Sequence, residues 1–220
     1  MRWGVLQFPG SCDERDALHA CGLAGEAQLI WHEERGLDGV DAVVVPGGFS
    51  YGDYLRAGAI ARFSPAMEAV AEFAAGGGPV LGICNGFQVL CEAGLLPGAL
   101  LRNDGLRFVC RQTDLIAAGA ESPFLAGIEE GERISIPVKH GEGRYHAPPS
   151  MLEELEANRQ VAFRYAPGQN PNGSVNDIAG VVNAAGNVLG LMPHPEHAVD
   201  PLTGSTGGLR LFSAISGATA

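Results

Sequence analysis

Cys84 lies in a sequence pattern that is typical of an enzymatic nucleophile. The run Gly82-Ile83-Cys84-Asn85-Gly86 follows a short apolar segment and precedes the helical pattern that begins at Phe87. Glycines two residues before and after the cysteine permit a sharp strand-to-helix turn, in which the nucleophile takes a strained backbone conformation. Such a turn places the sulfur at a helix N-terminus, where the dipole and free N–H groups favour a thiolate.

The alternative role for Cys84 is that of a small buried apolar residue. We expect that role for the other four cysteines, which are Cys12, Cys21, Cys91 and Cys110. For Cys84 we favour the catalytic interpretation, because its two flanking glycines have little structural use unless the turn is tight.

A second segment presents an imidazole beside a carboxylate, in the run Met192-Pro193-His194-Pro195-Glu196-His197. Each proline fixes its own φ and pushes the preceding residue toward extended conformations. On an extended backbone, His194 and Glu196 point to the same side, because they are two residues apart. They are candidates for the second and third members of a Cys-His-acid triad. The alternative is a proline-rich surface turn with two solvated polar side chains.

Gly47-Gly48-Phe49 follows the apolar run Val43–Val45, which we expect to be a buried strand. In an open parallel sheet, ligands bind beyond the carboxyl ends of the strands. The N–H of Gly48 could therefore join the N–H of Asn85 in an oxyanion hole. Without the elbow cysteine, we would interpret this segment as an ordinary strand exit.

The polar run from His140 to His146 invites comparison with metal sites. It lacks the downstream Pro-Cys-x-x-Cys of zinc deaminases, and the chain has no His-Glu-x-x-His motif. We therefore predict no metal, and we expect a polar loop near the active edge that contacts a substrate or partner. Asn170-Pro171-Asn172-Gly173-Ser174 is a strong turn signal that by itself indicates no function.

These candidate residues need a scaffold, and the first half of the chain predicts one. Apolar runs at 3–8, 27–31, 42–46 and 79–83 are expected to be buried strands. Between them, Asp13 is expected to cap a helix that reaches about Leu23. Ser64 and Pro65 are expected to be the N-cap and first residue of a helix that reaches about Ala75. Alternating strands and helices favour a parallel sheet with helices on both faces.

The second half is less regular. The alternation around Ile134, Ile136 and Val138 predicts a one-sided strand, which Pro137 places at a sheet edge or bulge. Further predicted elements are a helix at 151–158, strands at 161–165, 178–183 and 188–192, and a closing helix at 208–216. With no internal repeat or linker, we expect a single domain spanning residues 1–220.

Composition excludes several classes of protein. The chain has 220 residues and a net charge of −11, with a single lysine, Lys139, and scattered arginines, so nucleic acid is a poor ligand. No apolar run is long enough to span a membrane, and no secretory signal is recognisable. Five cysteines without a Cys-x-x-Cys pair argue against a disulfide framework, so we expect a cytoplasmic protein. The chain also lacks a phosphate-binding P-loop, so any ATP must bind to another chain.

Together these segments resemble the class I, or triad, glutamine amidotransferases. The resemblance spans nearly the whole chain. It is carried by the runs 46–58, 82–88, 136–143, 170–174 and 193–196. It implies a three-layer, flavodoxin-like α/β fold. It also implies that this chain is a glutaminase whose substrate is glutamine.

The same resemblance implies the role of each residue. Cys84 would be the nucleophile, His194 the acid and base, and Glu196 the residue that orients it. Gly48 and Asn85 would bind the oxyanion, while Gln88 and Phe49 would contact the substrate. No cofactor is expected in this chain. ATP and Mg²⁺ are expected on a large partner synthetase subunit, and a small accessory subunit is expected to complete the complex.

Three other interpretations stay open on the sequence. One is a different cysteine hydrolase, such as a peptidase or deglycase, on the same kind of sheet. Another is a non-catalytic binding module that has kept the fold. The third is a redox-sensing cysteine, which is weakened because the spacing identifies no resolving cysteine.

Overall fold

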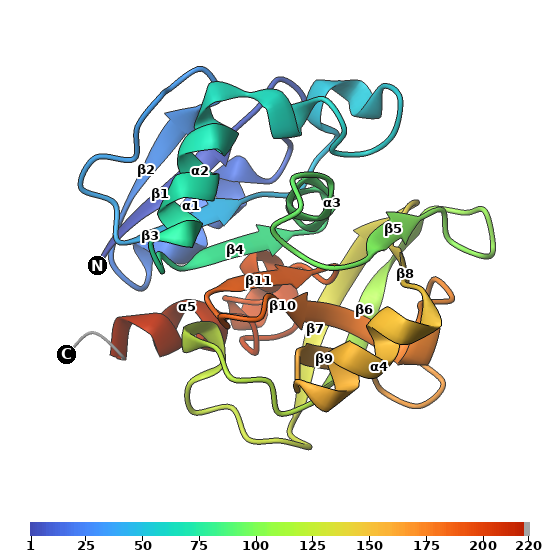
Figure 1. The fold of residues 1–220 in the computed structure, drawn as a ribbon. Helices are drawn as coiled ribbons and strands as arrows, with labels where there is room; N and C mark the ends of the chain where they lie inside the picture. Colours follow the sequence, from blue (N-terminus) through green and yellow to red (C-terminus); the bar gives the residue numbers. More distant parts are fainter. Residues whose placement is uncertain (218–220) are drawn as a thin grey trace.

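The computed structural model describes residues 1–217, and within them nine strands form one central sheet (Figure 1). The strand order is β2-β1-β3-β4-β11-β10-β9-β6-β7. The first five strands in this order are β2 (Glu26–Trp31), β1 (Arg2–Gln7), β3 (Ala42–Val45), β4 (Val80–Ile83) and β11 (Val188–Leu191). These five run parallel to one another, in the strand order of flavodoxin-like folds.

The remaining strands extend the sheet in antiparallel fashion. They are β10 (Ile178–Val182), β9 (Val161–Tyr165), β6 (Val109–Ala117) and β7 (Arg133–His140). Strand β7 is at the edge, as Pro137 predicts, and its buried and half-exposed residues alternate. Strand β6 was not predicted, because its first residues are exposed and largely polar. The short pair β5 (Ala99–Leu101) and β8 (Arg144–His146) forms a separate small sheet.

The helices are α1 (Glu14–Gly22), α2 (Pro65–Ala75), α3 (Asn85–Glu92), α4 (Pro149–Ala157) and α5 (Leu209–Gly217). In Figure 1, α2 lies in front of the parallel strands and α1 behind them. The core between the sheet and α5 is built around Trp3, whose ring lies 5.9 Å from that of Phe212. The prediction of an α/β sheet with helices on both faces is confirmed. No helix within residues 1–217 has the length and apolar character needed to cross a lipid bilayer.

Of the two predicted helix N-caps, Ser64 makes the expected capping hydrogen bond and Asp13 does not. Ser64 caps α2 as expected, since its hydroxyl accepts a hydrogen bond from the Met67 N–H and Pro65 follows it. Asp13 occupies the N-cap position of α1, but its carboxylate makes no capping hydrogen bond. The expectation that Asp13 caps this helix is therefore wrong: its side chain points toward charged groups from β7 and from the segment after β11.

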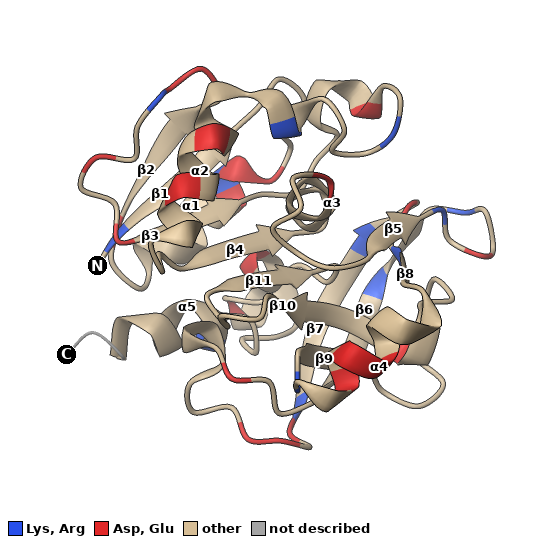
Figure 2. Cartoon of the chain, in the orientation of Figure 1, with Lys and Arg blue, Asp and Glu red and all other residues tan. Residues whose placement is uncertain are grey.

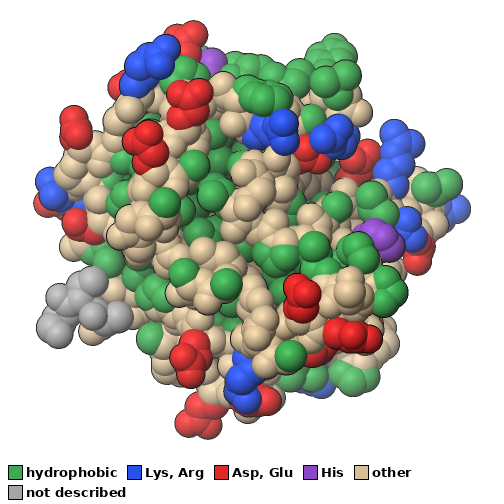
Figure 3. All heavy atoms as spheres, in the orientation of Figure 1, with side chains coloured by type: hydrophobic (Ala, Val, Ile, Leu, Met, Phe, Trp, Pro, Cys, Tyr) green, Lys and Arg blue, Asp and Glu red, His purple; other side chains and the backbone are tan. Residues whose placement is uncertain are grey.

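Acidic and basic residues are distributed over both halves of the sheet (Figure 2), and charged side chains of both signs lie on the face drawn in Figure 3. Ion pairs between such residues include Arg164–Glu156, with 2.6 Å between nitrogen and oxygen, and Arg159–Glu130, with 2.7 Å. Exposed pairs of this kind contribute about 0–1 kcal/mol each. Stability therefore depends mainly on the buried apolar core.

Gly86 provides a direct test of the packing at the turn after β4. A Cβ atom there would lie 1.8 Å from the carbonyl oxygen of Val45, which belongs to the neighbouring strand. We expect Gly86→Ala to lower the free energy of unfolding by about 3 kcal/mol, because backbone must move to admit the methyl group. Urea titration of the two proteins measures the difference.

Gly22→Ala is the matched control, because Gly22 is helical and has no neighbouring atom within 4 Å of the added carbon. We expect it to leave the free energy of unfolding unchanged or raise it by about 0.5 kcal/mol. Equal stabilities for the Gly86 and Gly22 variants would contradict the described packing.

Candidate active site

The turn after β4 holds Cys84 in a strained conformation. Its φ is 50° and its ψ is −103°, outside the regions that non-glycine residues commonly adopt. Gly82 makes the turn possible, since a Cβ there would lie 2.4 Å from Leu90 and 2.9 Å from the carbonyl of Gly86. The two flanking glycines are thus required by close packing, as the sequence pattern predicts. Helix α3 begins at the next residue, Asn85.

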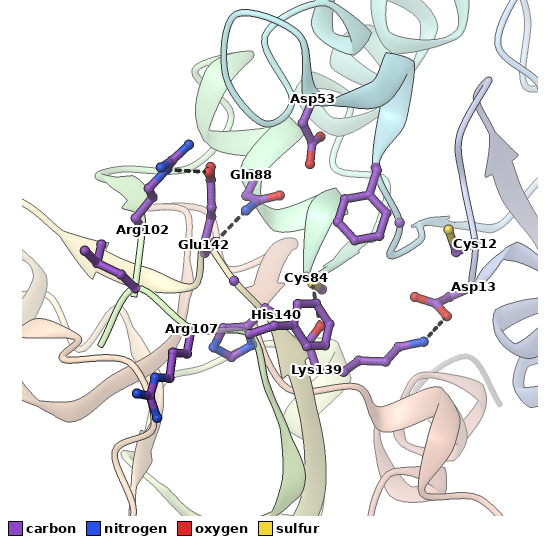
Figure 4. Close-up of a pocket in the computed structure, with 15 residues that line it drawn as sticks. Cys12, Asp13, Asp53, Cys84, Gln88, Arg102, Arg107, Lys139, His140 and Glu142 are labelled. Carbon is purple, nitrogen blue, oxygen red and sulfur yellow. Dashed lines mark hydrogen bonds and ion pairs between the residues drawn. The ribbon is translucent and has the colours of Figure 1, made fainter. Parts of the chain in front are cut away.

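Cys84 lies at the wall of a cavity of about 490 Å³ (Figure 4). The residue is 7% exposed, so its sulfur is neither sealed in the core nor free in solvent. The Sγ atom lies 3.9 Å from the carbonyl oxygen of Lys139 on β7. The cavity therefore lies between the elbow of the parallel half of the sheet and its antiparallel edge. A reagent in the cavity can reach the sulfur.

His194 and Glu196 lie buried behind this wall. The Nδ1 atom of His194 lies 2.6 Å from a carboxylate oxygen of Glu196. The prediction of an extended backbone is wrong here, because Pro195–His197 form a short 3₁₀ helix that contains Glu196. The backbone N–H of His194 donates a hydrogen bond to the carbonyl of Pro137, and this bond anchors the segment to β7. Because Nδ1 faces Glu196, Nε2 is the nitrogen left for other chemistry. It makes no hydrogen bond to any described residue.

The charges around His194 favour its protonated form. Burial by itself lowers the pKa of an imidazole, but the Glu196 carboxylate and the Cys84 sulfur act in the opposite direction. Their effect is larger, so the pKa of His194 lies above its ordinary value. An imidazolium beside a sulfur is the arrangement that stabilises a thiolate.

Gly48 lines the cavity, and its N–H donates no hydrogen bond within the described residues. The carbonyl of Gly47 accepts hydrogen bonds from the N–H groups of Cys12 and Asp13, each at 3.2 Å. In a trans peptide the N–H points opposite to the carbonyl, so the Gly48 N–H is directed away from α1. Neither this group nor the Asn85 N–H donates to another described residue. Both are thus available to bind an anion formed near Cys84.

The side chain of Asn85 ties the surrounding loops together. Its oxygen accepts from the Ser50 N–H at 3.0 Å, and its amide nitrogen donates to Asp53 and to Gln88. Gln88 in turn donates to the carbonyl of Glu142 at 2.6 Å. Gln88 lines the cavity, with both ends of its amide hydrogen-bonded to protein. Phe49 also lines the cavity and is 52% exposed.

The Asn170–Ser174 turn has a structural role that its sequence did not indicate. Asn172 is buried, and its amide donates to the carbonyl of Gly143 and to Nε2 of His140. The Ser174 N–H donates to the Asn172 oxygen, which fixes the orientation of the amide. The turn therefore clamps the 140–143 wall of the cavity.

Three residues near His194 were not predicted as site residues. Asp13, Lys139 and His197 form a partly buried network of ion pairs beside it. Asp13, His194, Glu196 and His197 place possible metal-ligand atoms within 4.8 Å of one another. The ammonium of Lys139 and the imidazolium of His194 already balance the two carboxylates, so the cluster needs no metal ion for charge balance. No sequence pattern marks this network, because its members come from three distant segments.

Comparisons with known proteins identify the class. The model of the CobB/CobQ-like glutamine amidotransferase domain matches residues 1–207. The chain belongs to this family.

Individual relatives are more specific. The chain is 58% identical to phosphoribosylformylglycinamidine synthase subunit PurQ of Synechococcus elongatus, over 98% of this chain and 97% of that protein. It is 56% identical to the subunit of the same name from Salinibacter ruber, over 97% and 95%. The solved structure of PurLQS from Thermotoga maritima superposes with a TM-score of 0.91 and 42% identity, covering 100% of this chain and 99% of that one.

The carboxyl of Asp53 provides a pH-dependent test of the cavity wall. Burial, followed by the charge of Glu142, raises the pKa of Asp53 to about 6, although the hydrogen bond from Asn85 opposes this. Between about pH 4 and 6 the folded chain therefore binds this proton more tightly than the unfolded chain. The contribution of Asp53 to stability is thus most favourable at low pH and is lost as the pH rises through 6.

Asp53→Asn should accordingly raise the free energy of unfolding above pH 7 by about 1 kcal/mol, a value reduced for solvent screening of this half-exposed group. The gain should disappear near pH 4. Urea titrations at both pH values measure it, with the exposed Asp38→Asn as control. A gain that is the same at both pH values would contradict the raised pKa.

Proposed function

We propose that this chain is the glutaminase subunit of a phosphoribosylformylglycinamidine synthase. In this role it hydrolyses glutamine and supplies ammonia to a separate ATP-dependent synthetase subunit in de novo purine biosynthesis. The proposal is supported by full-length similarity to subunits of that name, and by the match to PurLQS. The observation that carries the chemistry is a strained cysteine on a cavity wall, backed by an imidazole and a carboxylate 2.6 Å apart.

The reaction begins with Cys84. Its thiolate attacks the side-chain amide carbon of glutamine, and the N–H groups of Gly48 and Asn85 bind the oxygen as it gains negative charge. His194, oriented by Glu196, gives its proton to the amide nitrogen. The C–N bond breaks, ammonia leaves, and a γ-glutamyl thioester stays on the sulfur.

The second half of the reaction regenerates the enzyme. His194, now neutral, takes a proton from a water molecule as the water oxygen attacks the thioester carbon. The carbon–sulfur bond breaks, glutamate leaves, and the thiolate–imidazolium pair is restored. Gln88 and Phe49 contact the substrate in this scheme, and Gln88 also keeps the Glu142 wall in place.

The proposed partners are inferred from the missing P-loop and from the exposed apolar side chains at the cavity. ATP, Mg²⁺ and formylglycinamide ribonucleotide bind to the synthetase subunit, because this chain has no P-loop. A small accessory subunit completes the complex, which works in the cytoplasm. Phe49, Leu106 and Phe108 are exposed at the cavity, where Arg102 and Arg107 also contribute to the lining. Exposed apolar side chains interspersed with arginine fit a subunit interface.

The role of Cys84 is tested in the assembled complex. Cys84→Ala should reduce glutamine-dependent synthesis by a factor of about 10⁴ or more, since it removes the nucleophile. Synthesis from added ammonium salts should continue at the normal rate. Cys110→Ala is the matched control and should affect neither activity. Cys110 lies on β6 and, like Cys12, is exposed, so the expectation that both are buried is wrong. Equal loss of both activities in the Cys84 variant would show that this cysteine is structural.

Coupling to the synthetase is a separate expectation. The isolated chain should hydrolyse glutamine slowly, and the rate should rise at least about tenfold when the synthetase subunit is added, because an uncoupled site would waste ammonia. Glutamate release with and without the partner measures the effect. Equal rates in the two conditions would rule out partner-dependent activation.

A further inference from the structure

Asp13 is a buried carboxylate that its helix does not use. The side chain is 4% exposed and makes no capping hydrogen bond at the start of α1. The backbone alone serves the helix: the Asp13 carbonyl accepts from the Ala17 N–H, and the Asp13 N–H donates to Gly47. Burying a carboxylate is costly unless it is paired, so its partners must account for its position.

Those partners lie around His194. One oxygen of Asp13 accepts hydrogen bonds from the ammonium of Lys139 (Figure 4) and, at 3.3 Å, from Nε2 of His197. The other oxygen lies 3.7 Å from Nδ1 of His194, the same nitrogen that contacts Glu196. Two carboxylates thus lie near the same nitrogen of one imidazole.

Gly47 shows how closely Asp13 and His194 are packed. A Cβ atom on Gly47 would lie 2.3 Å from Oδ2 of Asp13, the oxygen that faces His194, and 2.8 Å from Cε1 of His194. Any side chain there would collide with both groups. A glycine at this position therefore permits the carboxylate to approach the ring.

From this arrangement we propose that Asp13 is a positioning residue for His194, a second carboxylate that holds the imidazolium beside Cys84. The proposal rests on the glutaminase function proposed above. Glu196 holds Nδ1 by a direct hydrogen bond, whereas Asp13 adds negative charge and fixes the ring. Lys139 and His197 keep Asp13 in place. Asp13 does not touch the reacting atoms, so it acts through His194.

The charged surroundings of Asp13 are consistent with this role. Burial alone would raise its pKa, but hydrogen bonding by His197 and the charges of His194 and Lys139 hold the pKa well below the ordinary value. The ionisable groups that face or flank its carboxylate are Lys139 from β7, His194 and His197 from the segment after β11, and Cys12 and Glu14 on its own segment. Glu196 and Cys84 interact with it through His194.

The test is the pH profile of kcat/KM for glutamine hydrolysis by the complex that carries Asp13→Asn. Without the Asp13 charge the imidazolium is less stable, and the unpaired Lys139 acts in the same direction. The alkaline limb, which reports loss of the imidazolium proton, should therefore move to lower pH by about one unit. At neutral pH we expect roughly a tenfold loss of kcat/KM.

Two variants serve as comparisons. Asp13→Glu restores the charge and should return the alkaline limb part of the way toward its original position. Glu14→Gln removes a neighbouring charge from the first turn of α1 and should leave the profile unchanged. Co-elution of each variant chain with the synthetase subunit in gel filtration reports that the complex is folded and assembled.

The outcomes are distinguishable. A lower plateau with an unmoved alkaline limb would mean that Asp13 is merely structural, and unchanged kinetics would likewise overturn the proposal. If the wild-type complex hydrolyses no glutamine, the proposed function itself fails. If the Asp13→Asn complex is too inactive for kinetics, the pKa of ¹³C-labelled His194 is measured by NMR titration of the isolated chain, with and without the substitution. A lower titration midpoint of His194 in the Asp13→Asn chain supports the role of Asp13, and an unchanged midpoint refutes it.

Discussion

The strained turn at Cys84 is the constraint on which the rest of the site depends. The residue joins a fully buried strand to a helix with a positive φ, and two close-packed glycines admit no larger side chain. A strained residue costs of order 1–3 kcal/mol and persists only where its surroundings fix it. Here the surroundings are parallel strands β3 and β11 on either side of β4. This rigid frame brings Cys84 to the cavity wall, and helix α3 begins at the next residue, Asn85.

Charge compensation is the second constraint, and it joins the two halves of the sheet. Buried carboxylates at 13 and 196 and a buried imidazole at 194 would be unfavourable separately. Together with Lys139 from the edge strand β7 they balance one another. The antiparallel extension therefore does more than enlarge the core. It supplies the lysine beside Asp13, and it provides the Pro137 carbonyl that anchors His194.

The sequence predicted those features that have a local cause. The elbow at Cys84, the cap at Ser64 and the edge position of Pro137 each follow from neighbouring residues. The proximity of His194 and Glu196 was also predicted, although Glu196 lies in a 3₁₀ helix and not on an extended backbone. The residues that were missed depend on long-range contacts. Asp13 looks like a helix cap because its type and position fit one, yet its partners lie 126 and 184 residues away along the chain. Likewise, nothing local shows that Asn172 clamps the wall at Gly143.

The account is tested most directly by identifying the covalent intermediate. The complex is mixed with glutamine, quenched in acid within one turnover, digested and mapped by mass spectrometry. The account predicts a γ-glutamyl thioester on Cys84. Cys12 provides an internal control, because it lines the same cavity while burial and the charge of Asp13 raise the pKa of its thiol. An adduct on Cys12, or glutamine hydrolysis with no adduct on any cysteine, would contradict the central claim.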